Sequence, residues 1–488
     1  MNRAIRRVGF ACTFLIVALV GQLTYLQVFD AEKLADDPRN VRKAIRDFSR
    51  PRGDIITADG QVVARSVPDD EDGDDFDFQR EYPQGDLFAQ IVGYQSFVYG
   101  NTGVEQEYND QLVGRDLDLD LRNIPDILSG KENTGNVVLT ISTPAQALAR
   151  DVLGGQRGSV VALNPRTGAI LAMYSNPSYD PNPYTGHDTV AVQAYGDLLR
   201  ADPNKPELPR TYRERFPPGS TFKVVTSTVG LDNGIVTPTE PVFATRTELD
   251  LPQSTNTLQN FGGSSCGGDL LESFTDSCNT TFGEIGLELG ERFVPGMEAF
   301  GVYSAPPLDL SPGAASSGGP PPGSFQQNQP NFAFAGIGQG DVFVTPLELA
   351  LIGGAIGNGG VIMRPHVMAE ITDAEGGSVR SFDDESWRTA TSPATAQTVT
   401  GLMVSVVENG TGDAAQIPGV TVAGKTGTAQ VTEGISPHTW FLAFAPAEDP
   451  QVAVAVLVEN GGDSGGDATG GEVAAPLARQ MIELLLGA

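Results

Sequence analysis

The chain has 488 residues and a formal net charge of −30 at neutral pH, and this length suffices for about two folded domains. The acidity disfavours nucleic acid as a partner, because binding it takes clustered Lys and Arg that displace counterions. Three His and three Cys without CxxC or HExxH spacing predict no metal site, and we expect no other cofactor.

The N-terminus has the pattern of a membrane anchor. Arg3, Arg6 and Arg7 precede a mostly apolar run over residues 8–29, and about 20 helical residues cross the ~30 Å hydrocarbon core of a bilayer. Basic residues before the run and acidic ones after it, at 30–37, predict a cytoplasmic N-terminus. A cleaved signal peptide is the alternative, disfavoured because the run is long and no Ala-x-Ala-like site follows. Either interpretation puts the rest of the chain outside the cytoplasm.

A domain boundary is expected near residue 155. Gly, Pro and Asp at the ends of short apolar runs separate the elements before it. The elements predicted there are a hairpin over 50–66 with Asp59-Gly60 at its turn, a helix over 100–114, a strand over 135–143 and a helix over 144–154.

The elements after residue 155 predict one sheet built from both ends of a large domain. Residues 158–175 form the clearest hairpin pattern, with strong turn residues over 164–168. Residues 451–461 predict a buried strand, and residues 471–488 a closing helix with apolar side chains at helical spacing. The Gly/Pro/Ser-rich residues 311–330 predict a long loop.

Ser220 and Lys223 form the only Ser-x-x-Lys pair of a chain with six Lys. They follow Pro217-Pro218-Gly219 at a predicted helix start, so both side chains should project from its first turn. A serine hydroxyl becomes a good nucleophile when a neighbouring base removes its proton. Lysine is such a base only when neutral, which requires lowering its pKa by about 3 units, or ~4 kcal/mol. Burial, a helix N-terminus and a second cation all act in that direction.

Ser277-Cys278-Asn279 lies between two helix-like segments. A hydroxyl and an amide on one short loop can relay a proton and bind a peptide carbonyl. A simple helix cap is the structural alternative. Ser254-Thr255-Asn256 has the same pattern, but it is disfavoured because Pro, Gln and Asn surround it.

The stretch "GVTVAGKTGTAQV" satisfies two motifs. Gly419 to Thr426 matches the P-loop pattern, which needs a helix beginning at Lys-Thr. The β-branched residues here predict an edge strand instead, with Lys425 facing a cleft, Thr426 and Thr428 binding a carboxylate, and Gly424 and Gly427 leaving room for a substrate backbone. ATP is also scarce outside the membrane, so we reject the P-loop.

Gly263 to Gly267 matches the Gly-x-Ser-x-Gly nucleophile elbow. That turn joins a buried strand to a helix. The preceding "LQNFGG" is not such a strand, so this motif is also rejected.

Ser220-x-x-Lys223, Ser277-x-Asn279 and Lys425-Thr426-Gly427 follow the order found in penicillin-binding proteins and serine β-lactamases. The surrounding sequence resembles the class B penicillin-binding proteins, and their actinobacterial members above all, over nearly the whole chain. The stretches that carry the likeness are "RPRGDIITADGQVVA", "GVEQEYNDQLVG", "GSVVALNPRTGAILAMYSNPSYDPN", "RFPPGSTFKV", "GIGQGDVFVTPLELA", "VAGKTGTAQ" and "HTWFLAFAP".

The resemblance implies an α/β (α+β) architecture: a transpeptidase domain with an antiparallel sheet flanked by helices, plus a helical subdomain. A transmembrane helix and a small pedestal domain should precede it. The implied parts are an anchor over residues 1–30, a dimerisation-type pedestal over 31–154 and the transpeptidase domain over 155–488. The pedestal lacks the length for a glycosyltransferase module, so glycan polymerisation would fall to a partner, in this family a SEDS-type polymerase.

The resemblance also implies a peptidoglycan D,D-transpeptidase of cell division or shape maintenance, inhibited covalently by β-lactams. Ser220 would form the acyl-enzyme, Lys223 would be the general base, and Ser277 would relay the proton. Asn279 would orient the donor peptide. Lys425, Thr426, Gly427 and Thr428 would form the carboxylate site, with the backbone N–H groups of Ser220 and Thr428 as the oxyanion hole.

Three alternatives remain open at this point: a D,D-carboxypeptidase, a β-lactam sensor and a non-catalytic division scaffold. No match to the deacylating Glu of class A β-lactamases is found, so fast β-lactam hydrolysis is not expected. Cys278 and Cys266 should both lie outside the cytoplasm, and we hypothesise a disulfide between them that stiffens the site entrance. Two separate thiols are the alternative.

Overall fold

The structure is a computed structural model that describes residues 2–29, 48–69, 76–116, 119, 134–430 and 434–488. The chain divides into two compact units. One comprises residues 1–51 with 67–79, and the other comprises residues 52–66 with 80–488. Each is described by itself below.

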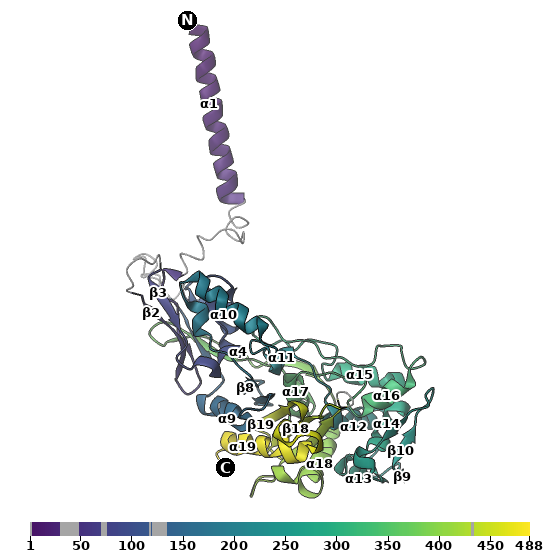
Figure 1. Cartoon of the computed structure of the whole chain (residues 1–488). Helices are drawn as coiled ribbons and strands as arrows, with labels where there is room; N and C mark the ends of the chain where they lie inside the picture. Colours follow the sequence, from purple (N-terminus) through teal and green to yellow (C-terminus); the bar gives the residue numbers. More distant parts are fainter. Residues whose placement is uncertain (1, 30–47, 70–75, 117–118, 120–133, 431–433) are drawn as a thin grey trace. The chain divides into compact units, whose positions relative to one another are not determined.

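The N-terminal helix has the length and composition of a membrane span. Helix α1 covers Asn2–Thr24, and a π-helical segment, Tyr25–Phe29, continues it (Figure 1). The candidate span Ile5–Gln27 has a mean hydropathy of 1.8 and buries none of its residues in the protein. An exposed apolar helix of this length is what a bilayer anchor needs. The acidic residues over 30–37 lie outside the described residues.

A five-stranded antiparallel sheet forms the centre of the larger unit. Its order is β17 (Ala423–Ala429), β18 (His438–Ala445), β19 (Val452–Val458), β7 (Gly158–Leu163) and β8 (Ile170–Asn176). The predicted hairpin and the late strand therefore share one sheet, as expected. All residues of β18, β19 and β7 are buried, which explains why their sequences are continuously apolar rather than alternating.

Helices cover this sheet in two pairs (Figure 1). Helix α9 (Thr143–Leu153) packs on β8 and on α19 (Ala475–Leu486), the predicted closing helix. Helix α17 (Pro346–Gly357) packs on β19 and on α18 (Pro393–Asn409), which also contacts β17. Strand β17 is an edge strand of this sheet, and the candidate site lies along it.

A helical subdomain stands beside that edge. The close packing of two of its helices depends on glycine: a Cβ on Gly286 would lie 2.3 Å from the Phe332 carbonyl oxygen, and one on Gly336 would lie 2.2 Å from that of Phe282. Residues 311–328 of the predicted loop form a loop, and residues 329 and 330 belong to α16. Glu291 holds the loop by accepting from Gly323 N and Phe325 N. The helices of the subdomain are α12 (Lys223–Asp232), α13 (Leu270–Thr275), α14 (Asn279–Leu289), α15 (Phe293–Ala299) and α16 (Gln329–Gly336).

A second sheet, ordered β15-β14-β6-β1-β2-β3, combines early and late parts of the chain. The predicted hairpin of β1 and β2 is present, with Ile55 opposite Ala64. The sequence did not predict that β14 and β15 would join this sheet; β14 pairs antiparallel with β6. The strands are β1 (Ile55–Ile56), β2 (Val62–Pro68), β3 (Phe78–Glu81), β6 (Asn136–Leu139), β14 (Met368–Thr372) and β15 (Ser378–Ser381).

The helix expected over 100–114 is instead two short helices, α5 (Gly103–Glu107) and α6 (Asn109–Leu112). The break falls at Tyr108, whose hydroxyl donates to Asp309 Oδ2 at 2.7 Å. A tertiary hydrogen bond to a distant residue thus overrides the local helical preference.

Candidate active site

Ser220 sits in a tight turn that is pressed against the edge strand. The turn is a 3₁₀ segment, Gly219–Phe222, and α12 begins directly after it at Lys223, so Ser220 lies just before the α-helix rather than in its first turn. Gly219 has φ +54°, and a Cβ there would lie 2.9 Å from the Thr428 carbonyl oxygen. Glycine therefore lets the serine-bearing turn approach β17.

Lys223 is fully buried and bonds only to neutral oxygens. Its Nζ donates to the Ser277 carbonyl oxygen at 2.6 Å and to Asn279 Oδ1 at 2.8 Å, and it lies 3.3 Å from Ser277 Oγ. No carboxylate of the described chain forms an ion pair with it. Burial, and then the nearby Lys425, lower the pKa of Lys223 well below its usual range. This is the direction of pKa shift that a general base at Lys223 requires.

Lys425 is the second buried amine of the site. Its Nζ donates to Ser277 Oγ at 2.9 Å and to the Thr426 carbonyl oxygen at 3.2 Å, so the Ser277 hydroxyl bridges the two lysines. Burial lowers the pKa of Lys425 to about 7. The amine is therefore poised between its charged and neutral forms near neutral pH, and an incoming carboxylate would favour the charged form.

Ser277 lies on the loop between α13 and α14, and Asn279 is the first residue of α14. Ser277 has φ +60°, a strained conformation for a non-glycine residue that concentrates at functional sites. The Asn279 amide is fixed at both ends, since its Nδ2 donates to the Gln259 carbonyl oxygen at 2.9 Å and its Oδ1 accepts from Lys223. The N-cap of α14 is Cys278, and its side chain makes no cap hydrogen bond, so the helix-cap alternative is wrong.

The serines of the alternative motifs form no hydrogen bond with Lys223 or Lys425 in the described structure. Ser254 Oγ accepts from Asn256 N at 3.0 Å in a local exposed turn. Gly263–Gly267 follows a 3₁₀ turn, Phe261–Gly263, rather than a buried strand, so no nucleophile elbow is present. β17 continues through Thr426 as a strand, so no P-loop helix begins there.

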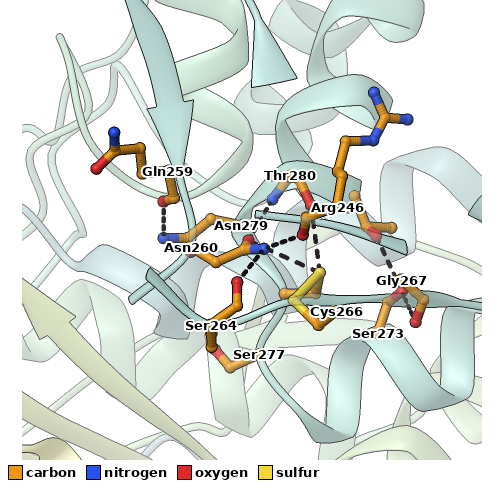
Figure 2. The surroundings of a disulfide bond; sticks show 12 residues. Arg246, Gln259, Asn260, Ser264, Cys266, Gly267, Ser273, Ser277, Asn279 and Thr280 are labelled. Carbon is orange, nitrogen blue, oxygen red and sulfur yellow. Dashed lines mark hydrogen bonds between the residues drawn. A yellow bond between two sulfur atoms is a disulfide. The ribbon is translucent and has the colours of Figure 1, made fainter. Parts of the chain in front are cut away.

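A disulfide joins Cys266 and Cys278, whose Cα atoms are 5.8 Å apart (Figure 2). It ties the Ser277–Asn279 loop to β12 (Cys266–Gly268), the strand that pairs with β9 (Phe243–Arg246). Asn260, drawn beside the bond in Figure 2, donates to the carbonyl oxygens of Arg246 and Ser264 at 2.8 and 3.1 Å. The loop that holds Ser277 is thus anchored from the side of the subdomain.

A cleft of about 400 Å³ runs along these residues. Ser220, Ser277, Asn279, Thr426 and Thr428 line it, so the structure brings the three sequence motifs together. The two lysines lie buried beneath. The lining residues that sequence reasoning missed are Asn260, Phe261, Ser264, Asp276, Thr411, Thr469, Gly470 and Gly471.

The hydroxyls of Thr426 and Thr428 already have partners. Thr426 Oγ1 and Thr411 Oγ1 are 2.6 Å apart, and Thr428 Oγ1 accepts from Gly470 N at 3.4 Å. Neither Thr411 nor Gly470 belongs to a recognisable motif. Both come from segments distant in sequence, so no signal in the sequence could have found them.

Gly424 and Gly427 were expected to leave room for a substrate backbone, and this expectation is wrong. A Cβ on Gly424 would lie 2.6 Å from Cζ of Phe441, and one on Gly427 would lie 2.8 Å from the Pro218 carbonyl oxygen. The glycines make room for the protein's own ring and for the Ser220 turn, not for a substrate backbone. They are needed to assemble the site.

Comparisons with known proteins agree with this geometry. Residues 158–483 match the family model "Penicillin binding protein transpeptidase domain", and residues 52–138 match "Penicillin binding protein A dimerisation domain". The peptidoglycan D,D-transpeptidase PbpA of Mycolicibacterium smegmatis is 42% identical over 100% of this chain and 99% of its own, and that of Mycobacterium tuberculosis is 40% identical over the same shares.

Solved structures are similar as well. The ceftriaxone acyl-enzyme of M. tuberculosis penicillin-binding protein A superposes with a TM-score of 0.83 at 38% identity, covering 91% of this chain and 100% of that one. Penicillin-binding protein 2 of Pseudomonas aeruginosa gives a TM-score of 0.73 at 31% identity, covering 90% and 97%.

Proposed function

The chain belongs to the penicillin-binding protein family, and from this premise we propose that it is a peptidoglycan D,D-transpeptidase that crosslinks stem peptides through an acyl-enzyme at Ser220. One observation carries the proposal: two buried amines without a carboxylate partner meet at the Ser277 hydroxyl, beneath the cleft that Ser220 lines.

The lone pair of Lys223 makes it the general base. A neutral amine has two N–H donors, and the short bonds to the Ser277 carbonyl oxygen and to Asn279 Oδ1 use both. The lone pair then remains to take the proton of Ser220 as its oxygen attacks the D-Ala-D-Ala carbonyl carbon. The backbone N–H groups of Ser220 and Thr428 bind the oxyanion that develops.

Ser277 completes the first half of the reaction. Its hydroxyl contacts both amines, so it passes the proton from Lys223 to the nitrogen of the departing D-Ala as the peptide bond breaks. An acceptor-stem amine then attacks the ester carbon. That amine loses a proton towards Lys223, Ser220 recovers its own proton, and a crosslink forms.

Lys425 binds the terminal carboxylate of the donor, or that of a penicillin. As an ammonium it has three N–H donors, and Ser277 Oγ and the Thr426 carbonyl oxygen use two of them. The third N–H and the hydroxyls of Thr426 and Thr428 face the carboxylate, while Gly427 keeps the strand close to the Ser220 turn. Asn279 orients the donor peptide.

The division of the chain and its location are part of the proposal. The parts are a membrane anchor over residues 1–30, a pedestal over 31–154 and the transpeptidase domain over 155–488. The anchor would be single-pass with its N-terminus in the cytoplasm, leaving the cleft outside. The family-model matches and the apolar helix support this arrangement. A SEDS-type glycosyltransferase would supply the glycan strands.

Labelling of the full-length protein with a fluorescent penicillin tests the proposal. We expect one adduct on the tryptic peptide that contains Ser220, and none with Ser220→Ala. An adduct on another residue would contradict it. With stem-peptide substrates, crosslinked dimers should form faster than free tetrapeptide. Formation of tetrapeptide alone would favour a carboxypeptidase. Slow acylation that yields neither product would favour a β-lactam sensor. Normal growth of cells carrying only Ser220→Ala would favour the scaffold.

The Cys266–Cys278 bond should also exist in the isolated protein. Mass spectrometry of the unreduced protein should show one alkylatable thiol, Cys12. Two further alkylatable thiols would contradict the bond.

A further inference from the structure

A cavity larger than the catalytic cleft lies in another part of the molecule. It has a volume of about 530 Å³, against about 400 Å³ for the cleft, and the two share no lining residue. Its walls come from residues 89–103, within the matched dimerisation domain, and from residues 179–213, within the matched transpeptidase domain. Ligand sites concentrate at such junctions, and their volumes fall in this range.

Tyrosines form much of the wall. Tyr212 and Tyr179 are buried, and their hydroxyls donate to the carbonyl oxygens of Gln90 and Ala89 at 3.2 and 3.4 Å. Tyr94 differs, because its hydroxyl has no hydrogen-bond partner among the residues described. Its ring is fixed by stacking on Tyr184, with centroids 4.2 Å apart. Burial raises the pKa of Tyr94 to about 12, so the phenol remains a donor at neutral pH.

Three cations and one carboxylate line the cavity, in a chain whose net charge is −30. Arg200 donates to Asp197 at 2.7 Å and to the Tyr99 hydroxyl at 2.8 Å. The Arg213 guanidinium donates to the Gly313 carbonyl oxygen. Neither it nor Lys205 Nζ forms an ion pair within the described chain, and both residues are exposed. Lys205 and Arg213 are therefore two cations of this wall that form no ion pair with an acid of the described chain.

The backbone conformation of Lys205 is unusual, and a buried neighbour stabilises it. Its backbone has φ +49°, an unfavourable conformation for a residue other than glycine. Arg210, which is fully buried, holds it there by donating to the carbonyl oxygens of Asn204 and Lys205. Strain that the surrounding structure supports in this way is typical of ligand sites.

We propose that this cavity is a second binding site, for a carboxylate or phosphate carried on a ring of sugar size. Lys205 and Arg213 would bind the anion through charge-assisted hydrogen bonds. The Tyr94 hydroxyl and the tyrosine walls would bind the ring. A ligand held there touches both matched domains at once, so it would fix their junction without entering the catalytic cleft.

The test uses the full-length protein in detergent, first acylated with penicillin G so that the catalytic cleft is blocked. N-Acetylmuramic acid supplies the carboxylate, N-acetylglucosamine 1-phosphate the phosphate, and N-acetylglucosamine the same ring without charge. Calorimetry should show saturable binding of at least one anionic probe, and binding of the neutral sugar that is weaker by about tenfold or more. Equal binding of the neutral sugar would overturn the anion site.

Variants locate the binding. Lys205→Ala combined with Arg213→Ala should weaken the anionic probe by about tenfold or more, and Tyr94→Phe should weaken it by a smaller factor. The matched control is Arg65→Ala combined with Arg150→Ala, which removes two exposed cations that do not line the cavity; it should bind as the wild type does. Wild-type affinity in the Lys205/Arg213 variant, or no saturable binding of either anionic probe, would overturn the proposal.

Discussion

Two of the regions that bury cations treat them in opposite ways. Beside the second sheet, Arg52 and Arg80 both contact the carboxylate of Glu105, and all three side chains are buried. In the catalytic cleft, Lys223 and Lys425 are equally buried, but their partners are a hydroxyl, an amide and carbonyl oxygens. The first cluster keeps its charges, whereas the lysines of the second are shifted towards their neutral forms.

The pKa directions follow from this difference. Burial alone would raise the pKa of Glu105, but the two guanidinium groups outweigh it and lower that pKa. In the cleft no anion offsets burial, so the pKa values of both lysines fall. A buried cation beside an acid keeps its charge, and removing the acid leaves that charge uncompensated, whereas a buried amine without an acid can act as a base.

Removing the amine of Lys223 should have the largest effect. Lys223→Met should slow acylation by penicillin by about 10²–10⁴-fold, because the general base is lost. The melting temperature should not fall, since an apolar side chain replaces a buried amine. Stopped-flow acylation checks the rate, and the control Arg150→Met, which removes an exposed cation outside both cavities, should leave it unchanged. A normal rate in Lys223→Met would contradict the assignment.

Removing the acid of the other cluster should cost stability rather than activity. Glu105→Gln leaves two guanidinium groups buried without an anion, which should destabilise the fold by about 3–5 kcal/mol. Differential scanning fluorimetry measures the effect. The control Glu81→Gln breaks the exposed pair with Arg65 and should cost no more than about 1 kcal/mol. Equal losses in the two variants would contradict the comparison.

Glu348 is an intermediate case, a buried acid whose two carboxylate oxygens have no hydrogen-bond partner in the described structure. Burial raises its pKa to about 8, although Arg388 opposes the shift. The unfolded chain ionises near pH 4.5, so the free energy of unfolding should fall as pH rises from there towards 8. Glu348→Gln should remove this loss and be more stable by about 4 kcal/mol at pH 8.

Melting temperatures at pH 5 and pH 8 check that prediction. The wild type and Glu348→Gln should differ more at pH 8 than at pH 5. The same difference at both values would mean that Glu348 keeps an ordinary pKa.

The smallest effect concerns Lys425 and the pH profile. With a pKa of about 7, the free enzyme loses this cation as pH rises, so kcat/KM for acylation by penicillin should fall above about pH 7. Lys425→Arg keeps its charge, so its descending limb should lie at least about one pH unit higher, whatever the overall rate. An unchanged limb would show that another group sets it.

The residues that we place at the reacting atoms were predictable because short spacing encodes them. Ser220 and Lys223 are three residues apart at a Pro-Gly-marked turn, and "GKTGT" carries β-branched residues around Lys425. The residue types and their short spacing were therefore enough to identify these two segments. Their convergence did not follow from spacing and rested on the resemblance to known enzymes.

The supporting wall of the cleft was not predictable. Thr411 and Gly470 reach Thr426 and Thr428 only through the tertiary fold, and neither stands in a motif. The roles of Gly424 and Gly427 were also misassigned, because a glycine in a strand signals close approach without saying what approaches.

The pairing of β6 with β14 affects how the protein can be made. Leu139 stands opposite Met368, so the ribosome must synthesise most of the chain before this sheet can close. Until then, the β6 backbone on that side has no strand to bond and can pair with another chain. A truncated fragment ending near residue 155 would carry this bare edge permanently, so it should aggregate unless β14 and β15 are supplied.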